Sequence, residues 1–178
     1  VWSMPINGGP ARKLTEDGAN VPAAWAPDGK SLYFFSDRSG KWGLYVMRPD
    51  GSGEERVGTV TVVPNQAGVS PDGQTILYSM AVAGNTDVYK VSVNGGSPVK
   101  LTSAPGIDVG GSFSPDGKQI VFESDRGGSQ QVYVMNADGS NQRRISHGGG
   151  RYATPEWSPR GDLIAYTRIA GDFRVGVM

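Results

Sequence analysis

The residues with the clearest potential for chemistry are two Ser-Asp-Arg runs, Ser36–Arg38 and Ser124–Arg126. Each places a hydroxyl, a carboxylate and a guanidinium next to one another, a combination of groups that also occurs in catalytic sites. The runs lie 88 positions apart at the ends of two similar stretches, WAPDGKSLYFFSDR and FSPDGKQIVFESDR. A set that recurs with its surroundings does not mark one unique catalytic site. We therefore interpret both runs as scaffolding, in which Asp bonds backbone N–H groups of its own turn and Arg braces an adjacent repeat unit.

Other catalytic patterns are missing from the sequence. The single histidine, His147, lies in a glycine-rich connector, where a side chain is more often solvated than catalytic. No G-x-S-x-G nucleophile turn, H-E-x-x-H zinc motif, or glycine pattern of a phosphate- or dinucleotide-binding loop occurs. The sequence therefore predicts a protein that is not an enzyme and that carries no cofactor.

One stretch has the composition of a calcium loop. Residues Asn136–Asn141 supply oxygen-bearing side chains, but the distal bidentate glutamate of such a loop is missing. The stretch also coincides with a turn that recurs elsewhere in the chain. With no cysteine present, thiolate sites are excluded as well, and we expect no metal.

The predicted turns and strands around these residues recur at a fixed interval along the chain. A Pro-Asp-Gly turn begins at Pro27, Pro71 and Pro115, and Pro159 begins its Pro-Arg-Gly counterpart, each 44 residues after the last. Pro favours the second position of a tight turn, and Gly supplies the positive φ that follows. After each turn comes an apolar run, such as SLYFF or QIVFE, that is typical of a strand covered on both faces. A period of this length is typical of a four-stranded propeller blade.

The period predicts an all-β fold without helices, a β-propeller of four-stranded antiparallel blades. We expect about four blades, cut mid-blade at both ends. The expected units are a partial blade at residues 1–15, blades at 16–59, 60–103 and 104–147, and a partial blade at 148–178. The abundance of glycine (27 residues) and proline (12 residues) agrees with many tight turns.

The connectors that enter the first strand of each unit differ between units, unlike the turns. In a propeller they lie at one end of the central channel, where loops on a rigid scaffold commonly bind partners. The candidate partner-binding residues at this channel mouth are Asn20, Asn65, Gln66, Asp108, Arg151, Tyr152 and Thr154. Tyr152 and Arg151 are of the types enriched at the energetic centres of protein interfaces.

Bulk properties narrow the class of partner. Charge is balanced at 17 basic and 17 acidic residues, without a basic cluster, so neither nucleic acid nor an anionic membrane is expected. No apolar run approaches the roughly 20 residues of a membrane-spanning helix. The chain opens at Val1 without a charged and apolar leader. We expect a processed form or an excised piece that has lost any export signal.

From about Pro105 to Met178 the sequence resembles the TolB-like propeller family. The residues that carry the likeness are GIDVGGSFSPDGKQIVFESDRGGSQQVYVMNADGS and ISHGGGRYATPEWSPRGDLIAYTR. The resemblance implies a six-bladed periplasmic propeller of the cell-envelope Tol–Pal system that binds a Pal-like lipoprotein near its channel mouth. By motif position it points to Asn20, Ala153 and Thr154 as partner contacts. Residues before about Val99 match only the general repeat.

Two other functions stay open from the residues alone. The chain is alternatively the propeller of a prolyl-oligopeptidase-like enzyme, or an engineered or excised propeller piece whose only activity is self-assembly. Blades that are apolar on both faces leave a terminal face exposed in an open arc. We therefore expect a homo-oligomer, with a dimer formed by exchange of terminal strands preferred over a small closed ring.

Overall fold

The structure, a computed structural model, describes residues 1–60, 64–170 and 172–177. Every regular element in this part of the chain is a β-strand. Three four-stranded antiparallel sheets follow one another. The first contains β3 (Asn20–Trp25), β4 (Leu32–Ser36), β5 (Gly43–Met47) and β6 (Glu55–Thr59). The second contains β7 (Pro64–Val69), β8 (Thr75–Val82), β9 (Asn85–Ser92) and β10 (Val99–Lys100). The third contains β11 (Asp108–Phe113), β12 (Gln119–Ser124), β13 (Gln131–Asn136) and β14 (Arg143–Arg144).

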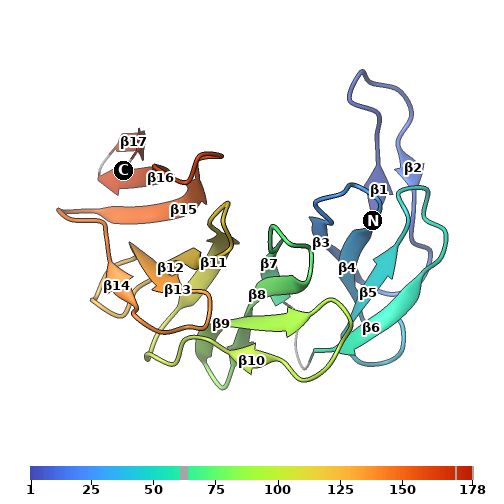
Figure 1. Cartoon of the computed structure of the whole chain (residues 1–178), viewed down its shortest axis with the longest axis horizontal. Coiled ribbons are helices and arrows are strands. Elements are labelled where there is room, and N and C mark those ends of the chain that lie inside the picture. The colour runs from blue at the N-terminus through green and yellow to red at the C-terminus, as the bar shows by residue number, and fades with distance from the viewer. Residues whose placement is uncertain (61–63, 171, 178) are drawn as a thin grey trace.

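Two smaller sheets flank these three blades. A three-stranded sheet contains β15 (Arg151–Trp157), β16 (Ile164–Ala170) and β17 (Asp172–Val177). A short hairpin pairs β1 (Trp2–Ser3) with β2 (Arg12–Lys13). The sheets stand side by side in an arc, with the β1–β2 hairpin at one end and β17 at the other (Figure 1). The predicted all-β propeller of four-stranded antiparallel blades is confirmed.

The first strand of each blade lies on the inside of the arc. β3 contacts β7, β7 contacts β11, and β11 contacts β15, so these inner strands line one continuous surface. Each inner strand carries an irregularity in its pairing, for example between Val109 and Ser112 in β11 and between Ala153 and Glu156 in β15. Such bulges bend a strand and redirect its side chains.

Alternating side chains of each second strand form the contacts between blades. On β4, Tyr33 and Phe35 join a cluster with β8, whereas Leu32 and Phe34 pack on the opposite face. On β12, Phe122 packs toward the second blade and its neighbour Val121 toward β15 and β16. Burial of one such side chain stabilises the fold by about 1.5–3 kcal/mol. The nearly continuous apolar runs of the sequence therefore reflect two buried faces.

The Pro-Asp-Gly turns have the geometry that their sequence predicts. Gly73 has a φ of 71° and donates its N–H to the carbonyl of Ser70, closing the turn. Asp72 accepts the N–H of Gln74 and the hydroxyl of Ser70. These hydrogen bonds hold the pKa of Asp72 below its ordinary value. The aspartate of this motif is occupied by its own turn.

The Ser-Asp-Arg runs brace their own blade, not an adjacent repeat unit. The Nε of Arg126 donates to the Ser124 hydroxyl (2.7 Å) on β12, and Nη2 donates to Asp108 (2.9 Å) on β11. Nη1 donates to Gln142 (2.7 Å), just before β14. The guanidinium also lies over the ring of Tyr133 on β13, 4.9 Å from its centroid. One side chain thus ties together all four strands of the blade.

The aspartate of each run holds the connector that enters the inner strand, not its own turn. Asp125 Oδ1 accepts the N–H of Ile107 (2.7 Å), and Asp37 Oδ1 accepts the N–H of Ala19 (2.8 Å). The connector approaches so closely that a Cβ on Gly106 would lie 2.2 Å from Asp125 Oδ1. Both runs are scaffolding, as the repeat predicted.

We expect Arg126→Ala to lower the free energy of unfolding by about 3–5 kcal/mol, because it leaves the Asp108 carboxylate, which is 1% exposed, without its cation. Urea unfolding followed by tryptophan fluorescence measures the change. Arg143→Ala, at an exposed position of the outer strand β14, is the matched control and should stay within about 0.5 kcal/mol. Equal effects of the two substitutions would contradict the proposed brace.

Candidate functional site

Two of the predicted mouth residues bind the arginines of the Ser-Asp-Arg runs. Asp108 is buried and paired with Arg126, and Asn20 accepts a hydrogen bond from Arg38 Nη2 (2.9 Å) through its side-chain oxygen. The amide nitrogen of Asn20 donates to the carbonyls of Asp17 and Gly18. The polar groups of Asn20 and Asp108 are therefore engaged within their own blades, and their predicted contact with a partner stays a prediction. In each of these two blades, this residue of the inner strand accepts a hydrogen bond from the arginine of the Ser-Asp-Arg run.

Tyr152 is a core residue, not an accessible anchor. Its side chain is 4% exposed and packs with Val121 and Ile164. The ring centroid lies 5.4 Å from that of Tyr166, and the hydroxyl donates to the carbonyl of His147 (2.8 Å). Tyr152 occupies the place in β15 that Asp108 has in β11, 44 residues earlier. Its burial corrects the prediction that it serves as the exposed aromatic of the mouth.

The other predicted residues divide between pairing positions and exposed positions. Ala153 is partly buried and pairs with Thr167 in the β15–β16 ladder. Asn65 and Gln66 belong to β7, but their side chains lie outside the described part of the structure. Arg151 and Thr154 are exposed. The structure brings these last two together at the inner edge of the fourth blade.

Thr154 is held in an unusual backbone conformation. Its φ is +50°, a left-handed value that a β-branched residue rarely adopts, and Gly110 has the corresponding place in β11 with a φ of +60°. The N–H of Thr154 donates to Glu123 Oε1 (2.6 Å), and its hydroxyl lies 2.8 Å from that of Thr167. These contacts hold the bulge of β15 in place.

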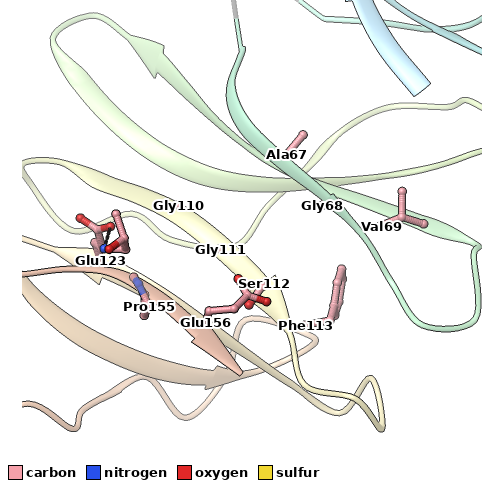
Figure 2. Close-up of a pocket in the computed structure, with 11 residues that line it drawn as sticks. Ala67, Gly68, Val69, Gly110, Gly111, Ser112, Phe113, Glu123, Pro155 and Glu156 are labelled. Carbon is pink, nitrogen blue, oxygen red and sulfur yellow. Dashed lines mark hydrogen bonds between the residues drawn. The ribbon is translucent and has the colours of Figure 1, made fainter. Parts of the chain in front are cut away.

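A cavity of about 560 Å³ opens along the inner strands of the last three blades. It is lined by residues 67–69 of β7, residues 110–113 of β11, Glu123 of β12 and residues 154–156 of β15 (Figure 2). Figure 2 shows Glu123 reaching from β12 to the bulge of β15. The cavity thus lies along the inner strands, on the inside of the arc (Figure 1).

Glu123 is the buried ionisable group of this cavity, and the repeat does not require it. It is 3% exposed, and the residues 44 and 88 positions earlier are Ser79 and Phe35. Burial raises the pKa of Glu123, whereas hydrogen bonds from the Thr154 N–H and the Gln130 amide and the charge of Arg151 act in the opposite direction. Sequence reasoning missed Glu123. The signal was a single charge inside the apolar run QIVFES.

A second hollow, of about 370 Å³, lies where the connectors lead into β11 and β15, at the predicted channel mouth. Its lining residues are Ile107, Asp125, Gly128, Ser129, Gln130 and Arg151. Arg151 Nη2 donates to Gln130 Oε1 (2.5 Å), and Gln130 Nε2 donates to Glu123. A chain of hydrogen bonds thus runs from the exposed Arg151, through Gln130 and Glu123, to the bulge at Thr154.

The two hollows present different polar groups. The mouth presents a guanidinium and an exposed isoleucine, and the cavity presents carboxylates and hydroxyls. Burial raises the pKa of Glu156 as it does that of Glu123. In the described residues, no group of three or more His, Cys, Asp or Glu side chains is arranged to hold a metal ion. Nor does the same part of the chain contain a helix long and apolar enough to cross a membrane.

We expect the buried Glu123 to make stability fall with rising pH. Because folding raises its pKa above the ordinary 4.5, its contribution is most favourable below pH 4.5 and is lost as the pH rises through the folded-state pKa. Glu123→Gln removes this titration, so its free energy of unfolding should decline less between pH 4.5 and neutrality. Urea unfolding of both proteins at a series of pH values measures the difference, and parallel curves would refute it.

Comparison with known proteins agrees with this architecture. The family model of the TolB beta propeller domain matches residues 61–178. The Tol-Pal system protein TolB of Geobacter sulfurreducens is 39% identical over 57 residues, which are 32% of this chain and 13% of that protein. The crystal structure of TolB from Acinetobacter baumannii superposes with a TM-score of 0.82 at 24% identity, over 99% of this chain and 45% of that one. Puromycin hydrolase shares the fold at 15% identity, with a TM-score of 0.74, over 97% of this chain and 32% of that one. The chain therefore spans less than half the length of each of these relatives, and it belongs to the TolB beta propeller domain family.

Proposed function

We propose that the chain is a non-enzymatic, protein-binding propeller of the TolB type. It acts in the periplasm as part of the cell-envelope Tol–Pal system, and it binds a Pal-like lipoprotein at the channel mouth. Membership of the TolB beta propeller domain family supports a role in the Tol–Pal system. The pocket at the mouth supports that end of the propeller as the place where the lipoprotein binds. The observation that carries the proposal is that exposed groups outside the repeat pattern, Arg151 and Ile107, line one hollow at that mouth.

The chemistry of the mouth fits a protein partner better than a reaction. Arginine is enriched at the energetic centres of protein interfaces, and an exposed isoleucine beside it adds apolar contact area. The resemblance to puromycin hydrolase concerns the fold alone at 15% identity. The reading frame of the parent gene distinguishes the two: a hydrolase domain with a G-x-S-x-G turn would favour the peptidase propeller instead.

We expect the periplasmic domain of a Pal-like lipoprotein to bind this chain, with loss of affinity when the mouth is altered. Ile107 is 48% exposed at the mouth, and Leu163 is 42% exposed beside the Pro-Arg-Gly turn at the opposite end. Ile107→Lys should weaken binding about tenfold, whereas Leu163→Lys, the matched control, should not change it. Isothermal titration calorimetry measures both. No binding to the unmodified chain, or equal losses in the two variants, would overturn the proposal.

We also propose that the chain associates as a dimer through its terminal strands. Among the described residues β17 is the edge of the last sheet, and the β1–β2 hairpin exposes Trp2, Met4 and Ile6 at the other end of the arc. Pairing of each hairpin with the β17 edge of a second copy covers both surfaces. Light scattering coupled to size exclusion should give twice the chain mass of 18.8 kDa, and a concentration-independent 18.8 kDa species would contradict it.

A further inference from the structure

Arg151 differs from the repeat arginines in how its guanidinium is used. Arg38 and Arg126 fold back over aromatic rings and donate to three partners each within their own blades. Arg151 is exposed, and in the described residues its side chain makes one hydrogen bond, from Nη2 to Gln130 Oε1. The same part of the chain gives it no ion pair. Its remaining N–H groups therefore face the mouth pocket and solvent.

Gln130 and Glu123 fix the direction of the Arg151 side chain. A side-chain amide has one accepting and one donating end, and a carboxylate only accepts. Because the Gln130 nitrogen donates to Glu123, the Gln130 oxygen must point the other way, toward Arg151. Glu123 is in turn fixed by the backbone N–H of Thr154 (2.6 Å). Arg151 thus stands on a support that is oriented before any partner arrives, which lowers the entropy cost of binding.

The surroundings of Arg151 combine one available cation with an apolar contact. Ile107 is exposed and lines the same pocket. Asp125 also lines it, but its Oδ1 accepts the N–H of Ile107 (2.7 Å) and so serves the connector. A guanidinium binds carboxylates through two parallel N–H donors, with both charge and direction.

We propose that the mouth pocket receives a carboxylate side chain of the partner, bound by Arg151, with an apolar neighbour of that residue against Ile107. Gln130 and Glu123 are positioning residues that hold Arg151 in its receiving orientation. The inference rests on the proposed function, since it names the chemistry of the partner segment at that same mouth.

The test uses two acetylated and amidated pentapeptides, Gly-Leu-Glu-Leu-Gly and its counterpart with glutamine at the centre. Nuclear magnetic resonance follows the Nε–H signal of Arg151 and the methyl signals of Ile107 during titration. The glutamate peptide should shift both sets of signals with a dissociation constant on the order of 1 mM, and the glutamine peptide should bind at least tenfold more weakly. Equal binding of the two peptides would overturn the inference.

Substitutions separate the receptor from its support. Arg151→Gln should weaken the glutamate peptide at least tenfold, whereas Arg160→Gln, at the opposite end of the blade, should leave it unchanged. Glu123→Gln presents a donor to Gln130, so the Gln130 amide turns over and faces Arg151 with a second donor. Arg151 should then become more mobile in its Nε relaxation, and peptide affinity should fall about threefold or more. Gln130→Met, which removes both the acceptor for Arg151 and the amide donor to Glu123, should have the same two effects. Unchanged relaxation and affinity in Glu123→Gln and Gln130→Met would overturn the positioning roles.

The peptide titration and the lipoprotein titration fail independently. A chain that binds the lipoprotein but treats both peptides alike would refute the carboxylate receptor and leave the proposed function standing. A chain that binds the glutamate peptide through Arg151 but not the lipoprotein would refute the proposed partner and leave the receptor.

Discussion

Every blade depends on its neighbours because its second strand is apolar on both faces. β4, β8 and β12 each direct alternate side chains into two different clusters, so neither face can meet water without exposing large aromatic or branched residues. Successive blades must therefore stand at a fixed spacing and in the same register. This requirement explains the 44-residue period of the sequence. Each unit needs the same number of residues to form its strands and to bring the chain to the start of the next inner strand.

The braces of the first and third blades solve a second problem that this stacking creates. At the mouth, each blade ends in backbone groups of a connector and of a turn that do not belong to the sheet ladders. Arg126 joins Asp108, Ser124 and Gln142, and Asp125 holds the connector, so these groups find partners inside the blade. The hydrogen bonds that the Arg126 guanidinium donates to these acceptors, and its charge beside Asp108, offset the cost of burying that carboxylate. The same residues are therefore unavailable to a partner, although their type and position suggest otherwise.

The period made the fold predictable, whereas the candidate site depended on contacts that no period reveals. Turn residues and apolar runs determine strands locally, so their positions follow from the sequence. Whether Asn20 is free or bound depends on the direction in which Arg38 folds back, which is a tertiary event. The burial of Tyr152 against Tyr166 likewise depends on the packing of the fourth blade. Glu123 was visible only as a charge where Phe35 stands in the first unit, and only the structure gives its partners.

Glu123 is the place where the third blade departs from the rule of apolar packing between blades. A carboxylate at the position of Phe35 forfeits hydrophobic burial and carries a desolvation cost, which its raised pKa reflects. The Thr154 N–H and the Gln130 amide offset part of that cost, and they lie on the two elements that shape the mouth. Thr154 adds a left-handed backbone where the preceding blade uses glycine. Natural sequences break local consistency chiefly where function requires it, and here the two departures touch one another and lead to the exposed Arg151. The fold alone does not need this arrangement, since the first two blades stack without it, and the positioning role proposed for Glu123 would account for it.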